Sequence, residues 1–262
     1  MNLTVSIIIP SLNCGVYIKE TLESLKQQTW PFYEIILIDS GSQDNTLEIV
    51  KQMSIDGLPI RVLISNKKEG PAKARALGIE NSRGDYIAFL DADDIWHPEK
   101  LKQQMKLMLD LKLGFTYTQI KTIDENGQVI SKNRTMQASY TFESLLRSRG
   151  ICTSSVIIHK SLLTNDILSL DSLAAEDLLW WLSILKKGAV AVLCPLSLVC
   201  YRIRSNSMSS NMLRNQKCIY DIYSKRLGLS KLKGNLLYLI YLGHVTKRYS
   251  KEILHNYFRG TT

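Results

Sequence analysis

The chain has 262 residues, of which 45% are hydrophobic, and its formal net charge is +9. This length and composition predict one large α/β domain, or one domain with an appendage, and argue against a disordered chain. The best candidate for a membrane span, residues 188–201, is too short and contains Pro195, and the opening run VSIIIP is too short for a signal peptide. Five scattered cysteines without a C-x-x-C pair argue against a disulfide framework or a zinc site and favour a reducing, cytoplasmic location, with each cysteine buried.

The positive charge is concentrated at the carboxyl end. Residues 202–262 contain twelve Lys or Arg and two acids, a net charge of +10, whereas residues 1–201 contain 21 basic and 22 acidic residues. We therefore expect a near-neutral body, residues 1–205, and a basic helical tail, residues 206–262.

Strands alternate with helices over the first 100 residues. The expected strands are 5–9, 34–38, 60–64 and 86–90. The apolar residues that should face the sheet from the first two helices are Ile18, Leu22, Leu25, Leu47, Val50 and Met53. Asp44 is the expected N-cap of the second helix, Gly70-Pro71 opens the third, and Pro98 is the expected first residue of the helix after the fourth strand. This alternation predicts a doubly wound, mostly parallel sheet.

The pattern changes after residue 100. Short strands are expected at 115–118, 153–159, 190–193 and 198–201, and helices at 142–147 and 175–187. Asp124 to Gly127 predicts a hairpin turn because Asn-Gly tolerates positive φ. This half, residues 101–205, is expected to be mixed α+β. The tail should be helical, with an apolar repeat at Leu242, Val245, Tyr249, Ile253 and Tyr257.

Three carboxylates, Asp91, Asp93 and Asp94, follow the buried strand 86–90 within four residues. Open α/β sheets bind ligands at the carboxyl ends of their strands. In extended backbone Asp91 and Asp93 would point the same way and could share a magnesium or manganese ion completed by phosphates. Taken alone, an acidic turn that caps the next helix explains the pattern equally well.

Asp39 ends the second expected strand, so Pro10, Asp39 and Asp91 should lie on one rim of the sheet. An acid at that place can accept a hydrogen bond from a ribose hydroxyl or from a base N–H. A turn-forming role beside Gly41 is an equal alternative.

Neither a G-x-G-x-x-G nor a G-x-x-x-x-G-K-[ST] phosphate cradle occurs in the chain. A diphosphate bound at this rim would therefore need a metal. Lys73 and Arg75, on the third expected helix, can reach a phosphate, although a solvated face is the more ordinary expectation for Lys73.

Glu176 and Asp177 begin a strongly apolar helix. The helix dipole alone favours acids in a first turn. The functional alternative is a general base, because an ionised carboxylate can take a proton from a hydroxyl nucleophile. The four histidines are scattered, pair with no nucleophile in a recognisable motif, and are expected to be structural or exposed.

Together these segments resemble the family 2 glycosyltransferases, whose fold is called GT-A. Four segments match in order, namely VSIIIPSLN, EIILIDSGSQDNT, GPAKARALGIENSRGDYIAFLDADD and EDLLWWL, and a weaker fifth is YRIRSNSMS. The resemblance covers about residues 3–210. It implies an inverting transfer of a sugar from a nucleotide-diphosphate donor, most commonly a UDP-sugar, to a hydroxyl of a glycan or lipid-linked acceptor in polysaccharide or lipopolysaccharide biosynthesis.

The resemblance also implies roles for individual residues. The implied nucleotide-binding residues are Pro10, Ser11, Asn13, Asp39, Arg75 and Asp91. Asp93 would hold the divalent metal, manganese or magnesium, and Asp177 would deprotonate the acceptor hydroxyl. A metal stabilises charge on the departing diphosphate, and one base that activates one hydroxyl on the opposite face inverts the anomeric centre. Residues 1–100 would then be the nucleotide-binding half and 101–205 the acceptor half.

Three positions depart from the family pattern. Ser40 stands where many members have a second Asp, and Ala76 stands where Asn is common, so both affect the expected donor preference. Arg204 replaces the His often found in the Y-R-x-H segment, and an Arg is better suited to bind a phosphate than a metal.

The basic tail lies outside the resemblance. One hypothesis places it against an anionic membrane, such as the inner face of the plasma membrane, or on a lipid-diphosphate acceptor. The equal alternative is a helical pair that packs on the body and exposes a solvated basic face.

Three other functions were weighed against the sugar transferase. A nucleotidyltransferase normally has a glycine-rich basic loop after the first strand, which PSLNCG matches poorly. A catalytically inactive nucleotide-sugar-binding scaffold of the same fold is opposed by intact Asp91, Asp93 and Asp177. Nucleic-acid binding is opposed by the near-neutral body and the lack of a recognised module.

Overall fold

The computed structural model describes residues 3–65, 70–131, 136–148, 150–170, 175–204 and 212–243. The strands in chain order are β1 (Val5–Ser11), β2 (Glu34–Asp39), β3 (Ile60–Ile64), β4 (Tyr86–Phe89), β5 (Ile95–Trp96), β6 (Phe115–Ile123), β7 (Val129–Ser131), β8 (Ser139–Tyr140), β9 (Ile157–His159) and β10 (Ala191–Arg202). The α-helices are α1 (Ile18–Lys26), α2 (Thr46–Ile55), α3 (Gly70–Glu80), α4 (Lys100–Asp110), α5 (Phe142–Leu146), α6 (Asn165–Leu168), α7 (Glu176–Lys186) and α8 (Met212–Asp221). Shorter or later helical segments are η1 (Thr153–Ser155), η2 (Lys160–Leu162), η4 (Ile222–Arg226) and the helix over 231–243.

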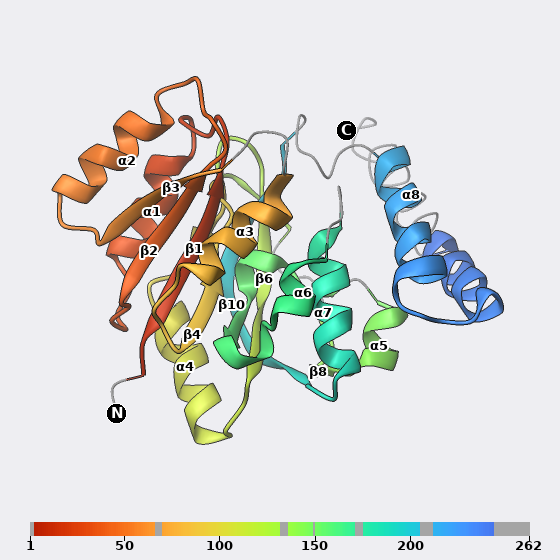
Figure 1. Cartoon of the computed structure of the whole chain (residues 1–262). Helices are drawn as coiled ribbons and strands as arrows, with labels where there is room; N and C mark the ends of the chain where they lie inside the picture. The colour runs from red at the N-terminus through yellow and green to blue at the C-terminus, as the bar shows by residue number, and fades with distance from the viewer. Residues whose placement is uncertain are drawn as a thin grey trace, which may run out of the picture.

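Within these residues one ten-stranded sheet has helices on both faces (Figure 1). The strand order is β3-β2-β1-β4-β9-β6-β10-β5, with β7 beside β6 and β8 beside β10. The neighbours β3, β2, β1 and β4 run parallel, whereas β9 is antiparallel to both β4 and β6. The predicted α/β sheet and its four parallel strands are therefore confirmed, and each strand end lies within two residues of its expected position.

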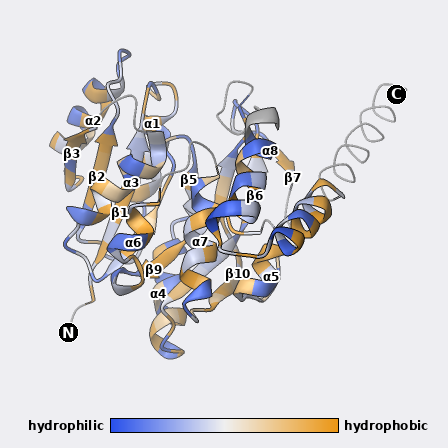
Figure 2. Cartoon of the chain, turned by 45° about the vertical axis from the view of Figure 1, so that its right-hand side comes forward, coloured by the Kyte–Doolittle hydropathy of each residue, from blue (hydrophilic) through white to orange (hydrophobic). Residues whose placement is uncertain are grey.

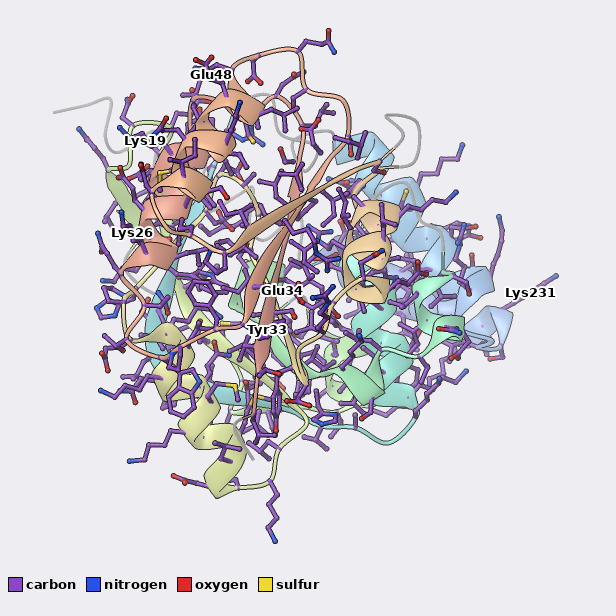
Figure 3. The ribbon with its side chains drawn as sticks, turned by 60° about the vertical axis from the view of Figure 1, so that its left-hand side comes forward. Lys19, Lys26, Tyr33, Glu34, Glu48 and Lys231 are labelled. Atoms are coloured by element: carbon purple, nitrogen blue, oxygen red, sulfur yellow. The ribbon has the colours of Figure 1, made fainter. Side chains whose placement is uncertain are left out.

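Alternate residues of the central strands supply two hydrophobic cores, one on each face of the sheet. Ile7 of β1 packs in the core with α1, α2 and α4, and Ile8 packs in the core with α3, α5, α6 and α7. Figure 3 shows Lys19 and Glu48 on the outer sides of α1 and α2. The predicted inward residues of these helices are buried except Leu47, which is 36% exposed.

Two helix starts differ from the prediction. Helix α4 begins at Lys100, two residues after Pro98, because residues 97–99 form a turn whose His97 carbonyl accepts from the Lys100 N–H. The N-cap of α2 is Asn45 rather than Asp44. The Asp44 carboxylate still accepts hydrogen bonds from the N–H and the hydroxyl of Thr46 at the start of that helix.

Two predicted strand patterns in the second half are wrong. Residues 153–155 form the 3₁₀ turn η1, and only 157–159 form a strand. The Ser155 hydroxyl donates to the Cys152 carbonyl, a local bond that favours a turn over an extended strand. The two strands expected at 190–193 and 198–201 are one strand, β10, which shifts register against β6 between Cys194, Ser197 and Val199. The hairpin turn before β7 is confirmed, with Gly127 at φ 83°.

The five cysteines are free thiols in this structure. Cys14 and Cys194 are buried as expected, whereas Cys152, Cys200 and Cys218 are only half-buried. Burial raises the pKa of both Cys14 and Cys194, so neither thiol is primed to ionise at neutral pH.

The described part of the tail packs on the body beside α5 and α7. The Tyr223 hydroxyl donates to the Leu146 carbonyl at 3.1 Å, and the Lys186 ammonium donates to the Leu227 carbonyl at 2.6 Å. Most of the predicted apolar repeat, from Val245 to Tyr257, lies outside the described residues. Among the described residues no helix combines the length and the apolar character needed to cross a membrane.

Candidate active site

The carboxyl ends of β1, β2 and β4 form one rim, as the sequence predicts. Ser11 lies opposite Asp39 in the β1–β2 register, and the Ser40 N–H donates to the Ser11 carbonyl at 2.9 Å. The Leu90 N–H donates to the Ile8 carbonyl, so Asp91 follows directly on the neighbouring strand. Pro10, Asp39 and Asp91 are therefore brought to the same edge of the sheet.

Asp39 is almost completely buried and organises the loop that follows β2. Its Oδ2 accepts from the N–H groups of Gly41 and Ser42, at 2.9 and 2.8 Å. Its Oδ1 accepts from the hydroxyls of Ser42 and Ser11, at 2.5 and 3.3 Å. These contacts support the turn-forming role that the sequence left open, and they leave the carboxylate little free surface for another partner.

Asn13 connects the loop after β1 to the loop after β2. Its backbone is left-handed, with φ 48°, a conformation that Asn tolerates better than most residues. Its N–H donates to the Ser42 hydroxyl at 2.9 Å, and its side-chain oxygen accepts from the Gln43 N–H at 2.8 Å. The two loops are thereby fixed together at the rim.

Arg75, on α3, joins the rim to helix α7, which lies on the same face of the sheet. Its side chain is 7% exposed, with Nη2 2.6 Å from Oδ1 of Asp91 and Nη1 2.5 Å from Oε1 of Glu176. Burial alone would lower the pKa of the guanidinium, but the charges of Asp91 and Glu176 outweigh it and raise the pKa, so Arg75 is charged. The sequence analysis noted Glu176 as an acid at the start of a helix, but its ion pair with Arg75 was not predicted, because the two residues lie 101 positions apart.

The three carboxylates after β4 lie on a turn and not on extended backbone, so the predicted geometry is wrong. The Asp94 N–H donates to the Asp91 carbonyl at 3.1 Å, which closes the turn. Asp94 is fully buried, and its Oδ1 accepts from the Arg202 N–H at 2.9 Å, so it attaches the turn to β10. Burial and the nearby Asp91 raise the pKa of Asp93, which places these two carboxylates within electrostatic reach of each other.

Two arginines at the end of β10 lie against the same turn. Arg202 is buried; its Nε donates to the Asp93 carbonyl at 2.8 Å, and its Nη2 lies 2.6 Å from the Glu20 carboxylate. Arg204 is half-exposed, and its Nε lies 2.6 Å from Oδ2 of Asp93. The Tyr17 ring packs against both guanidinium groups, with centroid distances of 4.9 and 5.5 Å. The alternation in YRIR is the signal that could have placed both arginines on one face.

Asp177 lies in the first turn of α7, directly after Ala175 at φ 56° and Glu176. It is half-buried; its Oδ2 accepts from the Thr153 hydroxyl at 3.0 Å and its Oδ1 from the Leu178 N–H at 2.7 Å. Thr153 was missed because the sequence predicts a strand there. Lys73, by contrast, is exposed on α3, which agrees with the expectation that it lies on a solvated face of the helix.

The side chains at this turn could bind a divalent cation only if a bound ligand, such as a diphosphate, supplied further oxygen atoms. Among the described residues no group of three His, Cys, Asp or Glu side chains is arranged to hold a metal. Asp91 and Asp93 supply hard carboxylate oxygens, and each faces a guanidinium group. Burial, and after it the charge of Asp91, raises the pKa of Asp93, and a cation bound between the two carboxylates would favour their ionised forms. Two carboxylates plus donor phosphates are the set that magnesium and manganese accept.

Comparison with known proteins gives the family. Residues 6–166 match the model for glycosyl transferase family 2. A Bacillus subtilis protein named for teichuronic acid biosynthesis, TuaG, is 31% identical over 244 residues, which cover 93% of this chain and 96% of TuaG. The Escherichia coli protein WfgD, named a UDP-Glc:α-D-GlcNAc-diphosphoundecaprenol β-1,3-glucosyltransferase, is 33% identical over 219 residues, covering 83% of this chain and 84% of WfgD.

Solved structures share the fold. TarS residues 1–349 from S. aureus, in complex with UDP-GlcNAc, superpose with a TM-score of 0.73 and 20% identity, over 92% of this chain and 72% of that one. The mannosyltransferase PcManGT from Pyrobaculum calidifontis, with GDP-Man and Mn²⁺, gives 0.67 and 18%, over 92% and 70%. The fold is thus GT-A, and together with the family match and the relatives this shows that the chain belongs to glycosyl transferase family 2 and is a glycosyltransferase.

Proposed function

We propose that the enzyme transfers a sugar, with inversion, from a nucleotide-diphosphate donor to a hydroxyl acceptor. The observation that carries this proposal is the double ion pair of Arg75. It fixes Asp91, at the rim expected to bind the donor, and Glu176, next to Asp177, on the two sides of one guanidinium. A donor-side carboxylate turn and a candidate base are therefore positioned by the same buried residue.

On the donor side, the nucleoside would lie over the loops built by Pro10, Ser11, Asn13 and Asp39. Because the Asp39 oxygens are already satisfied, we propose that the loop's shape, more than a new bond to Asp39, selects the nucleoside. Asp91 would face the ribose, and Asp93 would hold the divalent metal, manganese or magnesium. When bound, the metal would act as a Lewis acid on the diphosphate.

On the acceptor side, Asp177 would take the proton from the attacking hydroxyl. Thr153 and the Leu178 N–H orient its carboxylate, and the half-buried position leaves it open to an acceptor. A single base that activates a hydroxyl on the face opposite the leaving group produces inversion. Burial raises the pKa of the neighbouring Glu176 and the charge of Asp177 adds to this, whereas the paired Arg75 cation lowers it and so favours the ionised Glu176.

The relatives favour a donor and an acceptor class. WfgD uses UDP-Glc and a diphosphoundecaprenol-linked acceptor, TuaG is named for teichuronic acid biosynthesis, and TarS was solved with UDP-GlcNAc. We propose a UDP-sugar donor and a glycan or lipid-linked acceptor in surface polysaccharide biosynthesis. Residues 1–100 would form the nucleotide half, 101–205 the acceptor half, and 206–262 an accessory tail.

We also propose that the tail faces an anionic lipid surface. Helix 231–243 buries Leu237 and Tyr241 against the body and exposes Leu232, Leu236 and Leu239 by 82%, 57% and 63% on its other side. At 100° per residue these leucines form one stripe, which Lys231 and Lys233 flank on opposite sides. Lys233 is paired with Glu143, whereas Lys231 projects outward (Figure 3), and apolar residues recur along this helix (Figure 2). Such a stripe with flanking lysines suits an interfacial helix.

Flotation with anionic and with neutral liposomes tests the membrane contact. We expect the intact chain to float with anionic vesicles, and a variant with Leu232, Leu236 and Leu239 changed to Ser to remain at the bottom. A matched control changes the exposed Ile55, Val16 and Leu111, which lie on other elements, to Ser. If neither the intact chain nor the control floats with either vesicle, the membrane contact is wrong.

The donor site is tested by thermal unfolding with UDP, GDP, CMP and dTDP, each with and without Mn²⁺. A ligand at about 100 times its dissociation constant adds about 2.7 kcal/mol, or roughly 5–10 °C in Tm. We expect stabilisation by UDP that requires Mn²⁺ and disappears in Asp93→Ala. If no nucleotide shifts the Tm, the inactive scaffold becomes the better interpretation of this fold.

A further inference from the structure

Arg204 occupies the place at Asp93 that the proposed function gives to a metal. Its Nε lies 2.6 Å from Oδ2 of Asp93, and the Asp93 side chain is 15% exposed. Tyr17 supports the guanidinium from one side at 5.5 Å. Arg204 is itself 32% exposed, so part of its side chain lies at the edge of the site, although the Nε atom that contacts Asp93 is buried.

The other arginines that hold this turn are fixed by several partners. Arg202, 2% exposed, bonds the Asp93 and Glu125 carbonyls and Glu20, and Arg75, 7% exposed, pairs with two carboxylates. Removing Arg75 would leave the buried Glu176 without its cation, at a large free-energy cost, and removing Arg202 would break its bonds to two carbonyls and to Glu20 at once. Arg204 has one carboxylate partner, and its side chain is the most exposed of the three, so fewer contacts hold it in place. Of these three arginines, it is the one that can leave.

We infer that Arg204 neutralises Asp93 in the donor-free enzyme, is displaced from it when the metal enters, and then binds the donor diphosphate. This inference rests on the proposed metal role of Asp93. A metal entering alone must break the Arg204 contact and places a like charge beside the guanidinium. A metal that enters with a diphosphate provides the guanidinium with new anionic oxygens, which suit its planar donors.

The consequence is thermodynamic coupling between metal and donor. Because Arg204 competes with the metal and assists the diphosphate, each ligand should strengthen the binding of the other, and by the same factor. The empty enzyme would then bind free metal weakly, and the complete donor complex would assemble in preference to a metal-only state. An arginine at this position, in place of a metal-binding histidine, therefore makes metal binding depend on the presence of the donor.

The experiment measures Mn²⁺ binding directly, from the electron paramagnetic resonance signal of free Mn²⁺, with and without UDP. It uses the full chain, the Arg204→Gln variant and the Arg83→Gln variant. Arg83 is an exposed arginine just before β4, at the opposite end of that strand from Asp93, and serves as the matched control. Arg204→Lys keeps the charge and serves as a second variant whose folding is checked by its Tm.

Without UDP, we expect Arg204→Gln to bind Mn²⁺ about tenfold more tightly than the intact chain, equivalent to about 1.4 kcal/mol. With Mn²⁺ saturating, it should bind UDP several-fold more weakly, so the factor by which UDP tightens Mn²⁺ binding falls. Arg83→Gln should match the intact chain in both measurements, and Arg204→Lys should bind free Mn²⁺ as weakly as the intact chain.

Two outcomes overturn the inference in different ways. If Arg204→Gln and the intact chain bind Mn²⁺ equally without UDP, yet both bind it with UDP, Arg204 does not compete and the proposed metal role of Asp93 stands. If the intact chain binds no Mn²⁺ even with UDP, the metal role of Asp93 fails, and the inference fails with it.

Discussion

The two sides of the carboxylate turn are held by ion pairs of different kinds. On the α3 side, Arg75 is 7% exposed and pairs with Asp91 and Glu176, so three charged groups from three elements form one unit. On the β10 side, Arg204 is 32% exposed and pairs with Asp93. The buried Arg75 therefore maintains the architecture of the site, whereas the more exposed Arg204 makes a contact that a ligand can replace.

The largest expected effect concerns the chemistry on the Arg75 side. Asp177→Asn keeps the shape of the side chain but removes the proposed base, so we expect the rate of sugar transfer to fall by about 10²–10⁴-fold. Mn²⁺-dependent stabilisation by UDP should be unchanged, because no donor contact is proposed for Asp177. Radiolabelled sugar transfer and the Tm shift measure the two properties separately. A variant that transfers sugar at the normal rate would remove Asp177 from the mechanism.

The second prediction compares the two arginines by their contribution to stability. Arg75→Met leaves the buried Glu176 and the partly exposed Asp91 without a cation, so we expect the free energy of unfolding to fall by about 3–5 kcal/mol. Arg204→Met should lower it by less than about 1 kcal/mol. Urea unfolding measures both.

A double variant checks the reason for the Arg75 effect. The double variant Arg75→Met with Glu176→Gln removes the cation together with one of the two carboxylates that the cation neutralises. It should therefore be more stable than Arg75→Met alone. Equal losses from Arg75→Met and Arg204→Met would show that burial does not distinguish the two sides.

The smallest expected effect concerns a buried lysine without a carboxylate partner among the described residues, at the start of α4. Lys100 is fully buried 3.8 Å from the Trp96 ring centroid, and among the described residues its ammonium has no hydrogen-bond partner. Burial lowers its pKa well below the usual value. Since the unfolded chain then binds more protons, the free energy of unfolding should rise with pH up to about pH 10.5, by at most about 1.4 kcal/mol per unit.

The Lys100→Met variant isolates the contribution of Lys100 to the pH dependence of stability, because Met has a similar length and no charge. We expect the variant to be more stable than the intact chain at pH ~7 and the difference to shrink by pH ~8.5; the cysteines titrate in the same range but are common to both proteins, so their contribution cancels in the difference. Urea unfolding at the two pH values gives the comparison. An unchanged difference would mean that Lys100 has a normal pKa.

Local periodicity predicted most of the parallel half of the fold. Buried strands and helix stripes depend on residues close in sequence, and β1, β2, β3 and β4 form where that pattern predicts. Leu47 is an exception: at the start of α2 its neighbour Thr46 is the buried residue and accepts a hydrogen bond from the Cys14 N–H. The prediction for 153–155 failed because Ser155 bonds its own backbone neighbourhood.

The sequence predicted which residues lie at the candidate site better than it predicted the contacts among them. Strand ends placed Pro10, Asp39 and Asp91 correctly on one rim. The ion pairs of Glu176 and Glu20 were not predicted, because their arginine partners lie 101 and 182 residues away, whereas periodicity relates only residues close in sequence. The roles assigned to Asp93 and Asp177 stay predictions until the experiments above are made.

The irregular pairing of β10 has a consequence for how this enzyme tolerates change in chain length. After the register shifts at Cys194, Ser197 and Val199, Arg202 and Arg204 project to one side and Ile203 to the other. Because side chains alternate along a strand, adding or deleting one residue in 195–198 would present Ile203 to Asp93 and turn both arginines away. Insertions of two residues should be accommodated better than insertions of one, so viable length variants of this segment are expected to differ by even numbers.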